Sequence, residues 1–206
     1  MKVLLINGSP HEKGCTYTAL TAIAEQLEAN GVAAEIFWIG AAPVGGCIAC
    51  YKCRGGKGCV FGGTVNEAIE KLKTCDGVVF GSPVHYASAS GSMTGFMDRL
   101  CIAGGQHLYY KPAAVCCSAR RGGTTSTIDQ LTKVPQYFMM PLISGNYWPM
   151  VHGSNPAEVL QDEEGMEVMR QIGRNMAWVL KCIELGKQNG LDHPVNPPKP
   201  ATNFIR

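Results

Sequence analysis

The 206-residue sequence lacks the features that mark several large functional classes. It contains no cluster of Lys and Arg, and its net charge of only +2 gives no indication of nucleic-acid binding. No apolar run approaches the ~20 residues that a membrane-spanning helix needs. The amino-terminal segment has no small-residue cleavage site, so we expect no signal peptide and a cytoplasmic location. The content of 17% charged and 46% hydrophobic residues is typical of a globular domain.

Cysteine, by contrast, is abundant, with ten residues. Disulfide frameworks occur mainly in short secreted chains that lack a sufficient core. This chain is long enough for one domain with a core, so we expect its thiols to be reduced. Clustered thiols in a reducing compartment are typical of metal ligands or redox groups.

Apolar residues recur along the chain with a strand-like period in some segments and a helix-like period in the segments between them. Five strands that alternate with five helices predict a parallel, doubly wound sheet with right-handed crossovers. In such sheets the ligand binds at the carboxyl ends of the strands. The strands are expected at 2–7, 33–39, 76–82, 111–119 and 141–148, and the helices at 18–31, 64–75, 90–101, 124–140 and 162–186.

The first crossover, "GSPHEKGCT", leads from the buried strand 2–7 into a helix. Its backbone N–H groups and the helix N-terminus favour an anion such as a phosphate. The loop matches neither GxxxxGK[ST] nor GxGxxG, which disfavours nucleoside triphosphates and a standard dinucleotide site. A plain turn capped by Ser and Thr is the alternative. Side-chain donors in this segment are Ser9, Lys13, Thr16 and Thr18.

The third crossover, "GSPVHYASASGSMTGFMDR", places Val84, His85 and Tyr86 at the end of a strand, where a core usually stops. A flat apolar ligand would explain these groups, with Tyr86 stacking on it or closing over it. Taken alone, His85 is better explained as a partly exposed loop histidine than as a base.

Together, the two motifs resemble those of the NADPH-dependent FMN reductase group of the flavodoxin-like superfamily, and the resemblance covers residues 1–187. It implies a single-domain α/β sandwich of three layers, with a five-stranded parallel sheet in the order 2-1-3-4-5 and helices on both faces. Residues 1–187 would form the FMN-binding domain, with a Cys-rich loop at 43–63 after the second strand. A Pro-rich C-terminal tail would follow at 188–206.

The same resemblance implies FMN contacts residue by residue. The first loop holds the phosphate, the third lies beside the isoalloxazine, and the fourth, "SARRGGTT", meets the pyrimidine edge through backbone N–H groups. A solvated turn is an equal alternative for Arg120 and Arg121. No catalytic residue is assigned, because the flavin carries the chemistry. The implied FMN-binding residues are Ser9, Lys13, Cys15, Thr16 and Tyr17 for the phosphate, Pro83, Val84, His85, Tyr86 and Ser88 for the ring, and Ser118, Arg120, Gly122 and Gly123 in the fourth loop.

The second crossover contains "GCIACYKCRGGKGC", a C-x2-C-x2-C-x5-C pattern formed by Cys47, Cys50, Cys53 and Cys59. Four thiolates at this compact spacing favour a [4Fe–4S] cluster. Structural zinc more often uses two CxxC pairs across a longer gap. Zinc, a redox dithiol and free thiols remain as alternatives. The pattern resembles that of the iron–sulfur flavoproteins, which carry the cluster in the same loop, close to the flavin.

The resemblance implies a flavin oxidoreductase. FMN would accept electrons from NADH or NADPH and pass them, also through a cluster if one is present, to a small-molecule or ferredoxin-like acceptor. The alternative is an electron carrier without its own NAD(P)H turnover, although small flavodoxin carriers are usually acidic and this chain has a pI near 8.0. The resemblance also implies a homodimer or homotetramer. The segment 137–153 is a candidate subunit seam, with core packing as the alternative.

Overall fold

The computed structural model describes residues 1–195 and 200–204, and its centre is a parallel sheet. The order along the sheet is β2-β1-β3-β5-β6, and every neighbouring pair on this path is parallel. This confirms the predicted order of five strands. The strands are β1 (Lys2–Asn7), β2 (Ala33–Trp38), β3 (Gly77–His85), β5 (Ala113–Ala119) and β6 (Met150–His152), and a short β4 (Ser88–Ala89) pairs antiparallel with β3.

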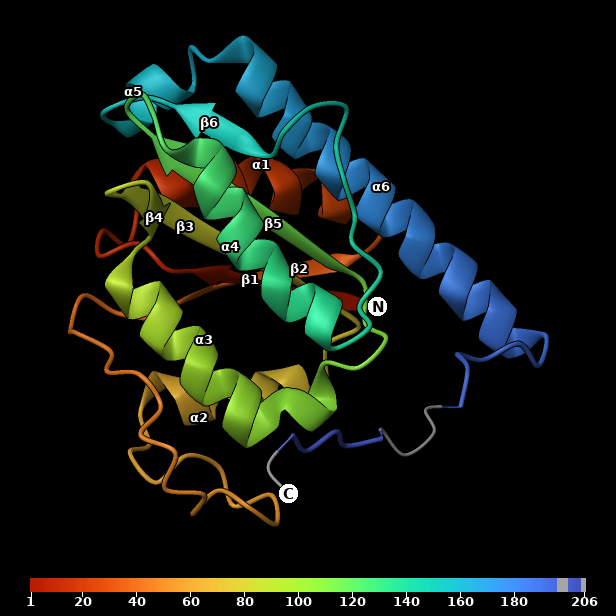
Figure 1. Cartoon of the computed structure of the whole chain (residues 1–206). Coiled ribbons are helices and arrows are strands. Elements are labelled where there is room, and N and C mark those ends of the chain that lie inside the picture. The colour runs from red at the N-terminus through yellow and green to blue at the C-terminus, as the bar shows by residue number, and fades with distance from the viewer. Residues whose placement is uncertain (196–199, 205–206) are drawn as a thin grey trace.

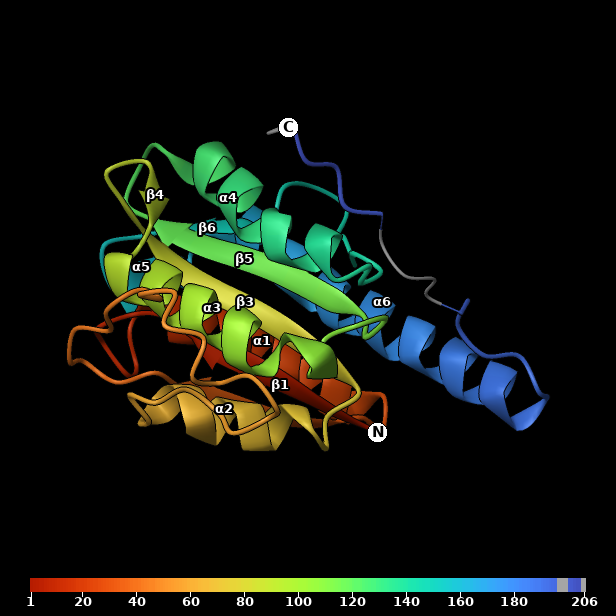
Figure 2. The ribbon, with the colours of Figure 1, turned by 60° about the horizontal axis from the view of Figure 1, so that its bottom comes forward.

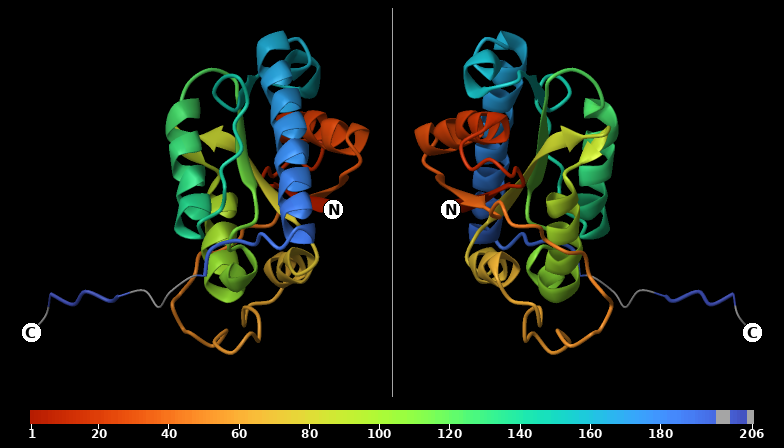
Figure 3. Two further views of the ribbon diagram at one scale, coloured as in Figure 1. Left: turned by 90° about the vertical axis from the view of Figure 1, so that its right-hand side faces the viewer. Right: turned by 90° about the vertical axis from the view of Figure 1, so that its left-hand side faces the viewer.

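Helices cover both faces of the sheet, as the side views in Figure 3 show. The helices α1 and α6 pack on one face, and α2, α3 and α4 pack on the other. Within the described ranges, no helix is long and apolar enough to cross a membrane. The helices are α1 (Cys15–Ala29), α2 (Thr64–Leu72), α3 (Gly91–Gly104), α4 (Thr124–Tyr137), α5 (Pro156–Val159) and α6 (Glu163–Gln188), with a 3-10 turn at Gly105–His107.

The two layers of core follow from the alternation of side chains along each strand. In β1, Leu4 and Ile6 point into the core beneath α2 and α3, whereas Val3 and Leu5 point into the core beneath α1 and α6. All four side chains are fully buried. A strand that is buried on both faces reads as a continuous apolar run, which is why the sequence indicated a parallel sheet.

The fifth strand of the sheet lies later in the chain than predicted. The expected strand at 141–148 is wrong, because this segment makes only one isolated parallel bridge, between Ala113 and Leu142. Beyond this bridge the chain packs against α6 at Gly145. A Cβ atom added to this glycine would lie only 2.9 Å from the Val168 side chain. The chain returns to the edge of β5 only at β6, three residues long.

The predicted tail begins where α6 ends, at Gln188. Beyond Gln188, the described residues of this segment form no helix or strand. The remaining tail positions, 196–199 and 205–206, lie outside the described residues.

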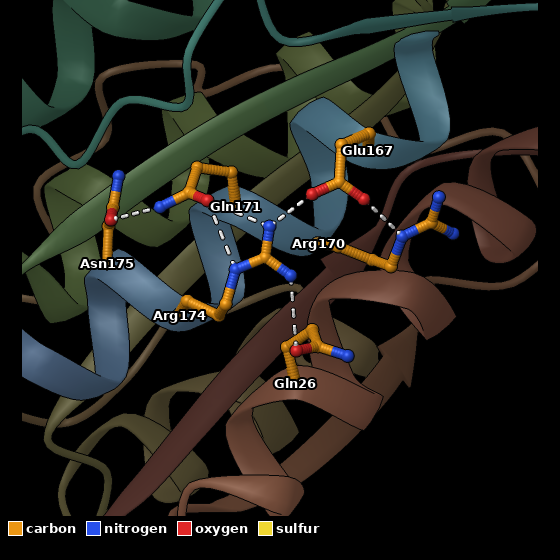
Figure 4. Close-up of polar contacts among 6 residues, drawn as sticks. All are labelled: Gln26, Glu167, Arg170, Gln171, Arg174 and Asn175. Atoms are coloured by element: carbon orange, nitrogen blue, oxygen red, sulfur yellow. Dashed lines mark hydrogen bonds and ion pairs between the residues drawn. The ribbon is translucent and has the colours of Figure 1, made fainter. Parts of the chain in front are cut away.

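A close backbone contact and a polar network hold α6 against α1 (Figure 4). Arg174 donates hydrogen bonds to Gln171 and to Gln26 of α1, at 3.1 and 3.5 Å, and it also pairs with Glu167. Near this network, Gly173 lies so close to α1 that a Cβ would fall 2.6 Å from the carbonyl oxygen of Ile23. The seam between the two helices therefore requires glycine at this point.

We expect Gly173→Ala to destabilise the protein even though alanine is the better helix former. The added methyl must push the two helices apart, and such overpacking costs about 1–3 kcal/mol. Gly186→Ala is the matched control on the same helix, because its nearest neighbour would be 3.5 Å away. That control is expected to gain up to ~1 kcal/mol. Urea midpoints measure both changes, and equal stabilisation by the two variants would contradict the contact at α1.

Candidate functional site

The crossover loops gather at the carboxyl edge of the sheet. In Figures 1 and 2 the loop before α1, the β3–β4 turn and α5 lie at the same end of the molecule, where the long loop after β2 also begins before it runs along α2 and α3. This follows from the topology, since the carboxyl ends of parallel strands meet at one edge. The predicted site residues of the first, third and fourth loops are therefore brought to one region.

Gly8 fixes the first loop against its neighbours. Its N–H donates to the carbonyl of Gly81 at 2.8 Å, and its own carbonyl accepts from the Ser90 hydroxyl at 2.7 Å. A Cβ on Gly8 would lie 2.6 Å from the sulfur of Met93. Only glycine lets the backbone pass between β3 and the start of α3.

Two residues that the sequence did not indicate shape the same loop. The Asn7 side chain accepts from the N–H of Ser9 at 3.1 Å and donates to the carbonyl of Glu12 at 2.9 Å. The Trp38 indole N–H donates to the carbonyl of Ser9 at 2.8 Å. A buried polar residue at the end of an apolar strand was the signal for Asn7, whereas no local pattern marks Trp38.

The predicted phosphate residues divide into buried and exposed groups. Ser9 and Thr16 are buried, and the Thr16 hydroxyl lies 2.9 Å from that of Ser118 at the end of β5. The Cys15 thiol donates to the carbonyl of Gly153 at 3.7 Å, and burial raises the pKa of this thiol. Tyr17 is half-buried, and Lys13 is exposed at the rim. The structure thus joins the first and fourth loops through two hydroxyl groups.

The N-terminus of α1 opens toward this region. Its N-cap is Gly14, which has no side chain to accept from the first turn, and no acidic residue lies in that turn. The first N–H groups of a helix have no partner within the helix. These N–H groups form the positive end of the helix dipole, next to the buried hydroxyls of Ser9 and Thr16. Helix N-termini with such donors are typical phosphate-binding sites.

The third loop forms a tight hairpin. His85 pairs with Ser88, and the two turn residues, Tyr86 and Ala87, both adopt left-handed backbone conformations, with φ of 51° and 58°. Such turns normally use Asn-Gly, because other residues are strained there. The Tyr86 side chain is fully exposed at the tip, His85 is exposed, and Pro83 and Val84 are half-buried.

The fourth loop packs directly on this hairpin. Gly123 has φ of 90°, and a Cβ there would lie 2.6 Å from the Cα of Ala87. The Ser126 hydroxyl donates to the carbonyl of Ala87 at 2.7 Å, and that of Ser88 donates to Gln130 at 2.8 Å. The exposed remainder of the turn consists of Arg120, Arg121 and Gly122.

The long loop after β2 brings its four cysteines around one small pocket, whose lining includes Cys47, Cys50, Cys53 and Cys59. Cys50 is exposed and the other three are half-buried. As the side chains stand, no three His, Cys, Asp or Glu residues of the described chain lie close enough to hold a metal ion. The structure thus places the predicted ligands on a common pocket without joining them into a closed site.

Residues of α2 and α3 anchor this loop. Asn66 of α2 accepts from the N–H of Cys59 at 2.7 Å and donates to its carbonyl at 3.0 Å. Arg99 of α3 donates to the Cys59 sulfur at 3.2 Å. The N–H of Ala49 donates to the Cys47 sulfur at 3.4 Å, and the Cys53 thiol donates to the carbonyl of Ile102 at 3.8 Å.

The backbone of the cysteine loop is rich in left-handed residues. Besides five glycines between 55 and 63, Ala49 and Tyr51 have φ of 52° and 56°. Successive turns of this kind point N–H groups into concavities that bind anions, including iron–sulfur centres. Left-handed residues other than glycine are strained, and such strain clusters at functional sites.

Comparisons with known proteins agree with this geometry. The family described as NADPH-dependent FMN reductase matches residues 1–155. An iron-sulfur flavoprotein of Methanocaldococcus jannaschii is 30% identical over 199 residues, which cover 89% of this chain and 100% of the relative. RosB, solved with 8-demethyl-8-formylriboflavin-5'-phosphate, has a TM-score of 0.70 at 13% identity and covers 100% of this chain and 95% of its own. An archaeal flavodoxin has a TM-score of 0.61 at 15% identity, over 88% of this chain and 99% of its own.

The structural neighbours establish a flavodoxin-like fold, as the sequence predicted. The chain belongs to the NADPH-dependent FMN reductase family, and its relatives include iron-sulfur flavoproteins. This membership places it among the flavin oxidoreductases.

We expect Ala87→Gly to stabilise the hairpin over the site. Glycine adopts φ near 58° without the strain that alanine bears there, and this gain exceeds the entropy that glycine loses on folding. The expected increase is about 0.5–1 kcal/mol, measured as a higher urea midpoint. Ala89→Gly is the control, because Ala89 is buried in β4 and its replacement should cost about 1 kcal/mol. A loss of stability in both variants would contradict strain at Ala87.

Proposed function

We propose that this protein is an FMN-dependent oxidoreductase that takes electrons from NADH or NADPH. One observation carries the proposal: the buried hydroxyls of Thr16 and Ser118 meet beside the uncapped N-terminus of α1, at the edge where the β3–β4 hairpin also lies. Such a cradle suits the phosphate of a nucleotide whose ring lies nearer the hairpin. Family membership supports FMN as that nucleotide.

The chain's own residues would bind and orient the cofactor. The phosphate would be held by Ser9, Thr16 and the first N–H groups of α1, with Cys15 and Tyr17 adjacent and Lys13 at the rim. The ring would lie against Pro83, Val84 and His85, with Tyr86 covering it and Ser88 bordering it. FMN, when bound, supplies hydride acceptance at its ring, so no side chain is required as a general base. In the fourth loop, Ser118, Arg120, Gly122 and Gly123 would face the polar edge of the ring.

We further propose that Cys47, Cys50, Cys53 and Cys59 hold a [4Fe–4S] cluster. The donor set fits, because four thiols line one pocket and backbone N–H groups already reach that pocket, with Ala49 donating to the Cys47 sulfur. The left-handed backbone around them supports an anionic centre. The curated relatives are named iron-sulfur flavoproteins, which supports an iron–sulfur centre without specifying its type.

The acceptor would be a small molecule or a ferredoxin-like protein, and the protein would act as a homodimer or homotetramer. Support for assembly comes from the segment 137–153, where Met139, Leu142, Tyr147 and Trp148 are exposed. Large exposed apolar groups of this kind mark contact surfaces.

The phosphate cradle is tested by comparing FMN with riboflavin, which lacks the phosphate. We expect FMN to bind about 100-fold more tightly, because several charge-assisted hydrogen bonds are lost with riboflavin. Thr16→Val should reduce this ratio about tenfold. Thr21→Val is the control, since its hydroxyl only donates to the carbonyl of Tyr17 on the same helix. Fluorescence titration gives both constants, and an equal affinity for the two flavins would place the phosphate elsewhere.

The donor is tested with the FMN-loaded protein under anaerobic conditions. We expect one equivalent of NADPH or NADH to bleach the visible absorbance of the flavin, because hydride transfer reduces the ring. Dithionite, which needs no nucleotide site, is the control reductant. Bleaching by dithionite but by neither nucleotide would assign the chain to the electron-carrier class instead.

A further inference from the structure

Arg99 is a buried cation in the middle of α3. Its residue is only 9% exposed, and its guanidinium reaches into the cysteine loop. Nε donates to the Cys59 sulfur at 3.2 Å and Nη2 donates to the carbonyl of Gly62 at 3.0 Å. The guanidinium also lies over the ring of Phe61, at 5.4 Å from the ring centre. Arg99 lines the same pocket as the four cysteines.

Among the described residues, the charge of Arg99 has no carboxylate partner. Throughout the part of the chain that the structure describes, no Asp or Glu forms an ion pair with Arg99. The adjacent Asp98 is exposed, and its carboxylate lies near Gly46 instead. A Cβ atom added to Gly46 would be 3.2 Å from that carboxylate. A buried charge is costly unless an opposite charge compensates it. The carbonyl of Gly62 and the ring of Phe61 offset part of this cost, and an anion in the pocket would offset the rest.

The loop itself contributes no acidic residue. Between 40 and 63 it contains Lys52, Arg54 and Lys57 and neither Asp nor Glu. The remaining source of negative charge in the pocket is the cysteine sulfur, and metal-bound cysteines are thiolates.

We propose that Arg99 is a positioning residue for the metal centre, acting as the counter-cation of its thiolates through Cys59. This inference rests on the proposed cluster. A [4Fe–4S] cluster with four thiolates carries two net negative charges when oxidised, and a third after it accepts one electron, with no bond made or broken. A fixed positive charge stabilises the more negative form more strongly. Arg99 therefore raises the reduction potential of the cluster and helps the loop to retain iron.

The experiment measures reduction potential and metal content in anaerobically reconstituted protein. Arg99→Gln removes the positive charge, and Arg99→Lys keeps the charge without the planar guanidinium group. We expect Arg99→Gln to disfavour reduction about tenfold, which corresponds to ~59 mV for one electron. Arg99→Lys should retain most of the wild-type potential. Dithionite is the reductant, and the reduced cluster is followed by electron paramagnetic resonance.

Arg54→Gln is the matched control. It removes the same charge from the same loop, but Arg54 is exposed and stacks on Tyr51 at 4.4 Å. Solvent screens such a charge, so the potential should change much less. FMN affinity checks that every variant is folded. If Arg99→Gln takes up FMN but no iron, recovery of iron by Arg99→Lys supports the role of the charge.

Three outcomes overturn the inference. If Arg99→Gln has the same reduction potential and iron content as the wild type, Arg99 is not a counter-cation. The cluster proposal is unaffected by that result. If Arg99→Gln and Arg99→Lys lose iron equally, Arg99 supports the loop only through its hydrogen bonds and not through its charge. A wild-type protein that binds FMN but neither iron nor sulfide, or that binds zinc alone, would overturn the cluster itself and the role of Arg99 with it.

Discussion

The passage of Gly8 between β3 and α3 is the contact on which the rest of the site depends. With its N–H bonded to Gly81 and its carbonyl bonded to Ser90, the first loop cannot shift relative to the third. Ser90 caps α3 as well, accepting from the N–H of Met93, and Arg99 lies nine residues after Ser90 on the same helix. One helix thus holds the phosphate loop at its start and the cysteine loop along its length, so both candidate centres share a rigid frame.

Much of the fold could be predicted from the sequence because the central strands β1 and β5 are short and almost fully buried. The run "KVLLIN" reads as a parallel strand, since Val3, Leu4, Leu5 and Ile6 are all buried between two helical layers. The fifth strand could not be located in the same way. The apolar run at 141–148 looks like a strand, but after one bridge to β5 the chain at Gly145 packs closely against Val168 of α6, and this contact is a tertiary one.

The site could be predicted loop by loop but not contact by contact. Crossover position and composition indicated the phosphate cradle and the four cysteines. The left-handed turn at Tyr86 and Ala87 could not be foreseen, because neither residue favours that conformation. Trp38 and Arg99 were missed for a different reason: each acts across more than twenty residues of chain, on a loop whose path the sequence does not reveal.

The anchors of the cysteine loop lie outside it. Asn66 holds Cys59 from α2 and Arg99 holds it from α3, whereas the loop before α1 is held by Gly81 of β3 and by Ser90. The stretch between Cys47 and Cys59 is consequently a segment that can be exchanged as a unit. Its length and cysteine spacing can therefore change without altering the hydrogen bonds that fix the loop before α1.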